Sequence, residues 1–127
     1  MRTSVPPEQL AHLSFPDAQV ERAELDLPSR RLTLRVDDAW LDIEGVRGIG
    51  AGELVITDWD QLDVRVYDHE TDKWSNGAFT PLRDICEFLV TASSIVLRGF
   101  AKDSGSWTEV SAVGKRVQGT YTPQTAI

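Results

Sequence analysis

The clearest structural signal in the chain is residues 94–110, which read SIVLRGFAKDSGSWTEV. Residues 95–100 are rich in β-branched and aromatic side chains, and residues 107–110 repeat that character after a break of Asp, Ser and Gly. Gly105 can take the positive φ that closes a short loop with a bulge. We therefore expect a β-hairpin in which Ala101 faces Trp107 and Gly99 faces Glu109, with the indole across the bare backbone at Gly99. This pattern is typical of a packing motif rather than of a ligand site.

Length and composition indicate one domain. A chain of 127 residues is long enough to bury a single sizeable core. Its one cysteine, Cys86, permits neither an internal disulfide nor a multi-cysteine zinc site. No apolar run suits a signal peptide or approaches the ~20 residues of a membrane span. We expect a soluble cytoplasmic protein whose single β-rich domain covers residues 1–127, with loose ends at 1–8 and 122–127.

The charge of the chain is strongly negative and unevenly placed. The formal net charge is −7, and residues 37–72 hold eleven acids against two bases. Nucleic acids and anionic membranes attract basic surfaces, so neither is expected as a partner. A basic protein is the partner that this charge favours.

Alternating apolar and polar residues predict most of the strands. They occur at 20–27 and 32–36, which reads as a hairpin, and again at 40–44. Residues 54–56 and 62–67 read as a strand and its return strand, and 117–121 as the last strand. The glycine-rich stretch 45–52 reads as a mobile connection, because no G-x-G-x-x-G opens a helix there. The pattern predicts a mainly β fold: an antiparallel β-sandwich or partly open barrel of about 7–9 short strands.

Two segments suggest helices. Thr80 and Pro81 can cap and begin a helix, and apolar residues follow at helical spacing, at positions 82, 85, 86 and 89. We therefore predict one helix near 81–91, with a strand over 85–91 as the rival interpretation. Pro7 can begin a short N-terminal helix that ends at Leu13.

The densest polar feature lies between residues 58 and 74. As a partner-binding surface it comprises Asp58, Trp59, Asp60, Asp63, Asp68, Glu70, Asp72 and Trp74. The alternative is a set of solvated turn residues that keep the protein in solution. A weaker alternative is a divalent metal site formed by Asp58, Asp60, Asp68 and His69, although the pattern of a calcium loop is missing.

The tryptophans and the cysteine also have competing interpretations. Trp59 lies at a turn between two aspartates, and Trp74 lies in a polar loop. An exposed tryptophan rimmed by acids resembles an interface hot spot, whereas an indole folded back over its own loop would only cover the end of a sheet. Trp40 and Trp107 are expected to pack. Cys86 has acidic neighbours, which favours a structural thiol over a reactive one.

These observations favour a non-enzymatic interaction module that docks on a basic partner through an acidic face, as an inhibitor or immunity-type protein would. The chain has no G-x-S-x-G motif, and its nearest acid–base candidates are the pairs Asp37–Asp38 and Asp58–Asp60. No cofactor is expected. The alternatives are a divalent-metal-dependent enzyme that uses the 58–72 cluster and a subunit of a homo-oligomer whose strand edges pair.

Overall fold

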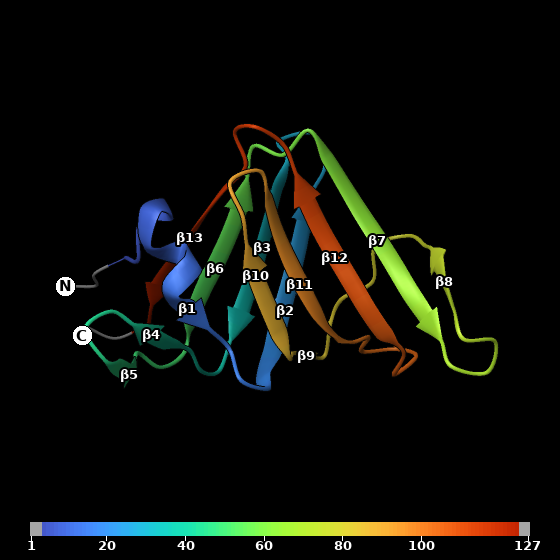
Figure 1. Cartoon of the computed structure of the whole chain (residues 1–127), viewed down its shortest axis with the longest axis horizontal. Coiled ribbons are helices and arrows are strands. Elements are labelled where there is room, and N and C mark those ends of the chain that lie inside the picture. Colours follow the sequence, from blue (N-terminus) through green and yellow to red (C-terminus); the bar gives the residue numbers. More distant parts are fainter. Residues whose placement is uncertain (1–3, 125–127) are drawn as a thin grey trace.

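The computed structural model describes residues 4–124, and antiparallel β-strands make up most of it (Figure 1). The mainly β class and the sandwich-like architecture are confirmed. Within the described residues there are thirteen strands, more than the seven to nine predicted. The excess consists of short strands of two to four residues, which are too brief to leave a periodic pattern in the sequence.

The strands form two five-stranded sheets and one small sheet. Sheet I has the order β10-β11-β12-β7-β8, with bounds Glu87–Val90, Ser94–Phe100, Trp107–Val113, Gln61–Asp68 and Lys73–Asn76. Sheet II has the order β13-β6-β3-β2-β9, with bounds Gln118–Pro123, Gly52–Thr57, Arg31–Val36, Ala18–Asp26 and Asp84–Ile85. The small sheet has the order β1-β4-β5, with bounds Leu13–Ser14, Trp40–Asp42 and Val46–Gly48, and the 3-10 helix η1 spans Pro7–His12.

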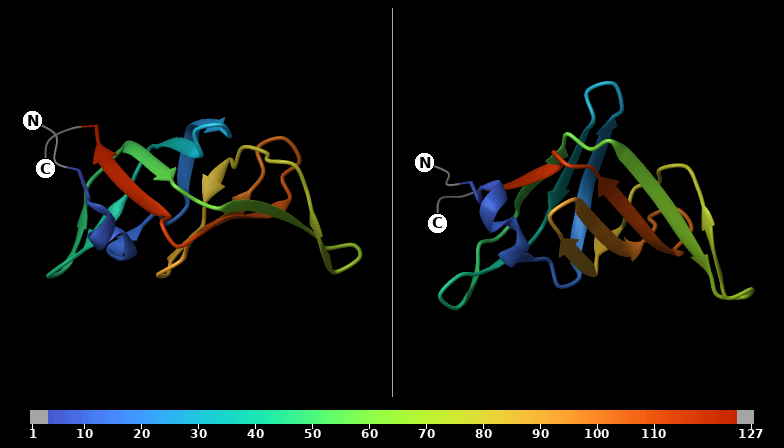
Figure 2. Two further views of the ribbon diagram at one scale, coloured as in Figure 1. Left: turned by 90° about the horizontal axis from the view of Figure 1, so that it is seen from above. Right: turned by 45° about the horizontal axis from the view of Figure 1, so that its top comes forward.

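The core lies where the inner faces of the two large sheets meet. Sheet II contributes Leu34 and Ile56, and sheet I contributes Ile95 and Leu97, all at most 2% exposed. Phe15 joins the two sheets, because its ring packs edge-on against Phe88 at 5.1 Å and against Tyr121 at 5.6 Å. Figures 1 and 2 show β8 at the end of sheet I that is farthest from this core.

Residues 82–90 are extended, so the predicted helix near 81–91 is wrong and the rival strand interpretation is correct. β9 pairs with β2 of sheet II, whereas β10 pairs with β11 of sheet I. The partly buried Phe88 and Val90 alternate with the exposed Glu87 and Leu89, which is a period of two. Only an extended backbone can pair with the edges of both sheets, and that requirement outweighs the helical spacing.

The corner between the two sheets depends on a glycine. Asp84, which is 7% exposed, accepts a hydrogen bond from the backbone N–H of Phe100 at 2.9 Å. A Cβ at Gly99 would lie 2.1 Å from the carbonyl oxygen of Asp84. The backbone of β9 can therefore cross β11 this closely only because residue 99 has no side chain.

The predicted hairpin at 94–110 exists, but its register differs by one residue. Phe100 pairs with Trp107 and Gly99 pairs with Thr108, so the indole lies on the opposite face from Gly99 and packs on Phe100. The loop is longer than expected. Ala101 N–H donates to the carbonyl of Ser106, so the turn that closes the hairpin lies between these two residues. The positive φ of Gly105, +71°, is confirmed.

Several other predictions can be compared with the strand pairing. The 20–36 hairpin is confirmed as β2 and β3, and the short N-terminal helix as η1. β6 and β7 do not pair, because residues 58–60 cross from sheet II to sheet I. The glycine-rich segment 45–52 is only in part a connection, since β5 within it pairs with β4.

The predicted loose ends are also corrected where the structure describes them. Val5 is 2% exposed and pairs with Tyr121, and β13 continues as far as Pro123. Residues 4–8 and 122–124 are thus held by sheet II and η1. The remainder of the predicted ends, 1–3 and 125–127, lies outside the described residues.

The close crossing at Gly99 yields a stability prediction. Gly99→Ala should lower the free energy of unfolding by about 3 kcal/mol, because the added methyl group meets backbone atoms that cannot rotate away. Urea unfolding followed by tryptophan fluorescence measures this change. Gly77→Ala is the matched control, since its Cβ would have only an ordinary contact, 3.6 Å from Val66 Cγ2. Equal stability of the two variants would contradict the packing described at the corner.

Candidate functional site

The outward face of sheet I, opposite the core, carries its side chains in rows that run across the strands. Directly paired residues of antiparallel strands share a face, so the register defines each row. The aromatic row consists of two directly paired sets, Phe100 with Trp107 on β11 and β12, and Tyr67 with Trp74 on β7 and β8. The ladder between β12 and β7 ends at the adjacent pair of Thr108 and Val66, so Trp107 and Tyr67 lie on the same face. The adjacent charged row consists of Glu87, Arg98, Glu109 and Arg65, from β10, β11, β12 and β7.

The aromatic row is accessible to a partner. Phe100 and Trp107 have ring centroids 5.1 Å apart, and Tyr67 and Trp74 have centroids 5.4 Å apart. Each of these rings is partly exposed, and Trp74 is 39% exposed. The rings are tilted by 68° and 58° within the two pairs, so they do not form the flat platform on which nucleic-acid bases stack.

The charged row is organised by a buried carboxylate. Glu109 is 6% exposed, and its Oε1 accepts hydrogen bonds from Arg65 Nε at 3.0 Å and Nη2 at 2.8 Å. Its Oε2 accepts one from Arg98 Nε at 2.8 Å, and Arg98 also reaches Glu87 at 3.3 Å. Burial alone would raise the pKa of Glu109, but the hydrogen bonds from Arg98 and Arg65 outweigh it and lower that pKa.

This network positions part of the aromatic row. With its Nε and Nη2 held by Glu109, the guanidinium of Arg65 lies 4.8 Å from the ring centroid of Trp74. At the other end of the row, Arg83 lies 5.3 Å from the ring centroid of Phe100. These contacts support two of the rings and leave part of each exposed.

The hairpin between β7 and β8 adds negative charge beside the aromatic row. Asp68 Oδ1 accepts the backbone N–H of Glu70 at 2.9 Å, which shapes the turn, and Tyr67 donates its hydroxyl to Asp72. That hydrogen bond is the main reason why the pKa of Tyr67 is raised, with smaller contributions from burial and from the charges of Asp72 and Asp68. We call the aromatic row together with Asp68, Glu70 and Asp72 the β7–β8 surface.

The structure divides the predicted partner-binding set between the two ends of β7. Asp68, Glu70, Asp72 and Trp74 lie at one end, whereas Asp58 and Asp60 lie at the other, roughly 25 Å away for a strand of this length. Asp63 lies between them, on the row that Val96 and Ser111 share, and accepts hydrogen bonds from Gln61. The acids that are continuous in the sequence therefore do not form one cluster.

The acids at the far end have basic neighbours. Asp58 accepts a hydrogen bond from Gln118 at 3.0 Å, and Asp60 lies 4.0 Å from Arg30. Lys115 and Arg116 line the same shallow depression. Trp59 is 3% exposed and belongs to the hydrophobic core, so its indole is not available to a partner.

The residues of the metal alternative are not brought together. Asp58 and Asp60 are separated from Asp68 and His69 by the length of β7. Within residues 4–124, no three His, Cys, Asp or Glu side chains are grouped so that they could hold a metal ion.

The acid–base pair Asp37–Asp38 and the thiol of Cys86 are held in structural roles. Asp37 accepts the backbone N–H of Gln19 at 2.8 Å, and Asp38 accepts that of Ala39 at 2.9 Å, so both carboxylates serve local backbone donors. Burial, followed by the charge of Asp84, raises the pKa of Cys86 to about 12, which keeps the thiol protonated and unreactive at neutral pH.

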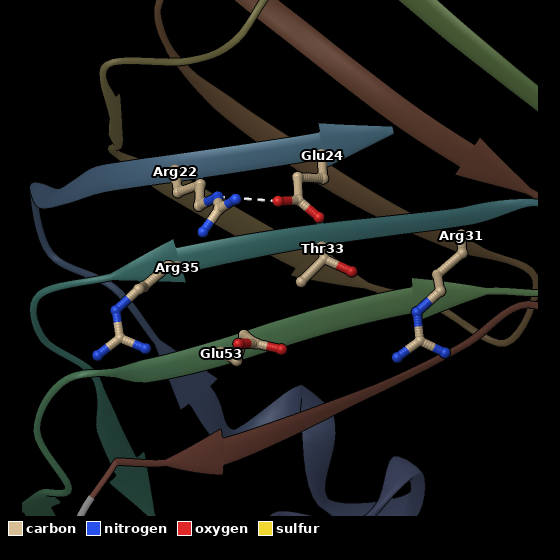
Figure 3. A pocket seen from close by; sticks show the side chains of 6 residues that line it. All are labelled: Arg22, Glu24, Arg31, Thr33, Arg35 and Glu53. Atoms are coloured by element: carbon tan, nitrogen blue, oxygen red, sulfur yellow. Dashed lines mark ion pairs between the residues drawn. The ribbon is translucent and has the colours of Figure 1, made fainter. Parts of the chain in front are cut away.

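A second charged surface covers the outward face of sheet II. A shallow depression of about 360 Å³ lies there, and Figure 3 shows the side chains that line it: Arg22, Glu24, Arg31, Thr33, Arg35 and Glu53. Arg22 pairs with Glu24 at 2.8 Å, and Arg35 donates to Gln124 at 2.6 Å. Three arginines and two glutamates share this face, so its charges largely cancel and it favours no one class of ligand.

The sequence interpretation missed most of the outward face of sheet I. It predicts that the Trp107 indole packs across Gly99, and it does not single out Phe100, Arg65, Arg98 or Glu109. The available signal was the alternation of polar and aromatic residues along 96–100 and 107–111. Because a shift of one residue moves a side chain to the other face, the expected pairing of Gly99 with Glu109 concealed the rows.

The charged row leads to a prediction about pH. Glu109→Gln should lower the free energy of unfolding by about 2 kcal/mol at pH 7, because two arginines lose a charged partner. The pKa of Glu109 in the folded protein lies below the ordinary 4.5, so its contribution is present above that pH and is lost as the pH falls. The difference between wild type and variant should therefore shrink below about pH 4.5.

Urea unfolding at pH 7 and at pH 3.5 measures both effects. Glu87→Gln is the matched control, since Glu87 is exposed and touches only one of the two arginines; it should cost about 0.5 kcal/mol. A difference for Glu109→Gln that is independent of pH would show that the carboxylate does not act through its charge.

Comparisons with known proteins do not supply a function for this chain. No family model, curated protein or solved structure matches it. In the described part of the chain, no helix is both long enough and apolar enough to span a membrane. The chemistry of the β7–β8 surface is therefore the basis on which a function can be inferred.

Proposed function

We propose that this protein is a non-enzymatic interaction module that docks a basic protein partner on the β7–β8 surface. The observation that carries the proposal is the row of four partly exposed aromatic rings beside the three acids of the hairpin. Tryptophan, tyrosine and arginine are the residue types that contribute most to binding energy at protein interfaces. Here Tyr67, Trp74 and Arg65 lie together at the exposed end of sheet I.

The charge around the row favours a cationic partner. Residues 68–73 of the hairpin contain three acids and one lysine, Lys73, and the neighbouring Arg65 is paired with Glu109. A partner's arginine or lysine can contact the exposed part of the Trp74 ring while its charged group approaches these carboxylates. The net charge of −7 also attracts a basic protein from a distance and raises its rate of association.

An inhibitor or immunity-type role is consistent with this surface. Such a protein acts by covering a cationic partner, for which a rigid sheet with aromatic anchors and complementary charge is sufficient. The network around Glu109 holds Arg65 in place before binding, so little side-chain freedom remains to be lost.

The first test changes the aromatic contact and the acidic contact in separate variants. Trp74→Ala should weaken retention of a basic partner by about tenfold, as expected for a hot-spot residue, and Glu70→Lys should weaken it by reversing a charge in the hairpin. The purified variants serve as baits in a lysate of the source organism, washed at low and at high salt, and the retained proteins are quantified by mass spectrometry. Binding that depends on charge should be lost at high salt.

Glu21→Lys is the matched control, because it makes the same change of charge at an exposed position of sheet II. The proposal predicts a basic protein that wild type and Glu21→Lys retain equally and that Trp74→Ala and Glu70→Lys lose. If both lysine variants lose it equally, net charge alone determines binding and the β7–β8 surface is not the site.

A further inference from the structure

We propose that an extended segment of the basic partner adds to the free edge of β8 as a sixth strand of sheet I. The inference rests on the proposed function and specifies how the partner is held. β8 is the last strand of its sheet, and its four residues are all exposed. Figures 1 and 2 show the outer side of β8 facing away from the rest of the chain.

The hydrogen-bond pattern shows which backbone groups of β8 are directed outward. Gly77 N–H donates to the carbonyl oxygen of Val64 at 3.0 Å, which makes these two residues a hydrogen-bonded pair of the antiparallel ladder. Such pairs alternate along a ladder, so Ser75 and Lys73 also direct their backbone groups towards β7. The N–H and C=O groups of Trp74 and Asn76 therefore point to the open side, with the spacing that an added strand requires.

The other edges of the two large sheets are covered by this chain itself. Val5 pairs with Tyr121 at the free side of β13, and η1 packs against β13. The free side of β10 lies beside η1 and β1. β8 is distant from all of these elements, so its edge is left for another molecule (Figure 1).

Charge favours a basic segment over a second copy of this chain as the occupant of the β8 edge. Two copies would bring together two chains of net charge −7, each with an acidic hairpin beside its β8 edge. On the outward face, Tyr67 is paired with Trp74 and donates its hydroxyl to Asp72, so the Asp72 carboxylate lies on the same side as the Trp74 ring. A segment with a cationic residue opposite Asp72 and an apolar or cationic residue opposite Trp74 would match both.

A synthetic peptide can represent this segment. The acetylated, amidated heptapeptide Thr-Lys-Thr-Val-Thr-Lys-Thr places Lys, Val and Lys on one face of a strand and has high β propensity. A second peptide of the same sequence carries N-methyl groups on alternate amides, which preserves the charge but blocks pairing along one edge. The two are titrated into isotope-labelled protein at low salt, and backbone amide shifts are followed by NMR.

The proposal predicts saturable shifts centred on the amides of Trp74 and Asn76, and about fivefold weaker binding of the methylated peptide, which loses backbone hydrogen bonds. Asn76→Pro should weaken binding of the unmodified peptide similarly, because it removes an outward N–H but no bond to β7. Asn76→Ala is its control and should bind as wild type does.

The remaining outcomes separate this inference from the proposed function. If both peptides bind equally well and Glu70→Lys abolishes their binding, strand addition is overturned and the acidic, aromatic surface remains as the site. Shifts on the small sheet or on sheet II would overturn both. Absence of saturable binding by either peptide would also overturn strand addition by a basic segment, whereas the lysate experiment tests the proposed function independently.

Discussion

The crossing of two backbones at Gly99 and Asp84 is the constraint on which the rest of the structure depends. Residues 82–90 leave sheet II at β9 and enter sheet I at β10, so one segment closes the corner between the sheets. The carboxylate of Asp84 supplies an acceptor for the Phe100 N–H at the point where the regular ladder is interrupted. Without this crossing, β11 would not be held beside β9, and the hairpin of β11 and β12 would lose its orientation to the core.

The outward face of sheet I follows from that orientation. The face of β11 that contains Gly99 lies against β9. Because side chains alternate along a strand, Arg98 and Phe100 point to the opposite face, away from the core. Their cross-strand partners Glu109 and Trp107 then complete the charged row and the aromatic row. The same alternation that builds the core on one side therefore places the proposed binding surface on the other.

The sequence was sufficient for local structure and insufficient where distant segments meet. Alternation located β2, β3, β11 and β12, because each has a buried face and a solvated face. The spacing of apolar residues in 82–89 satisfied both a helix and a strand, and only pairing with two sheets decides between them. In the hairpin at 94–110, the register differs from the expected one by one residue. This difference is enough to move both Trp107 and Glu109 to the opposite face of the sheet.

The candidate site shows the same limit. The acids of residues 58–72 are close in sequence, yet an eight-residue strand, β7, separates Asp58 and Asp60 from the hairpin. Trp59 is buried because its segment crosses between the sheets, whereas Trp74 is partly exposed because β8 is an edge. Neither fact could be obtained from the residue types, since both tryptophans have acidic neighbours in the sequence.

Site-specific photo-crosslinking tests the central claim, that the β7–β8 surface receives a basic protein, most directly. Benzoyl-phenylalanine would replace Thr71, in the turn between β7 and β8, in one variant and Trp40 in another, since both side chains are exposed and neither carries the proposed contacts. The account predicts that irradiation in the source cells links a basic protein to position 71 and not to position 40. Adducts with the same proteins at both positions, or no adduct at position 71, would contradict it.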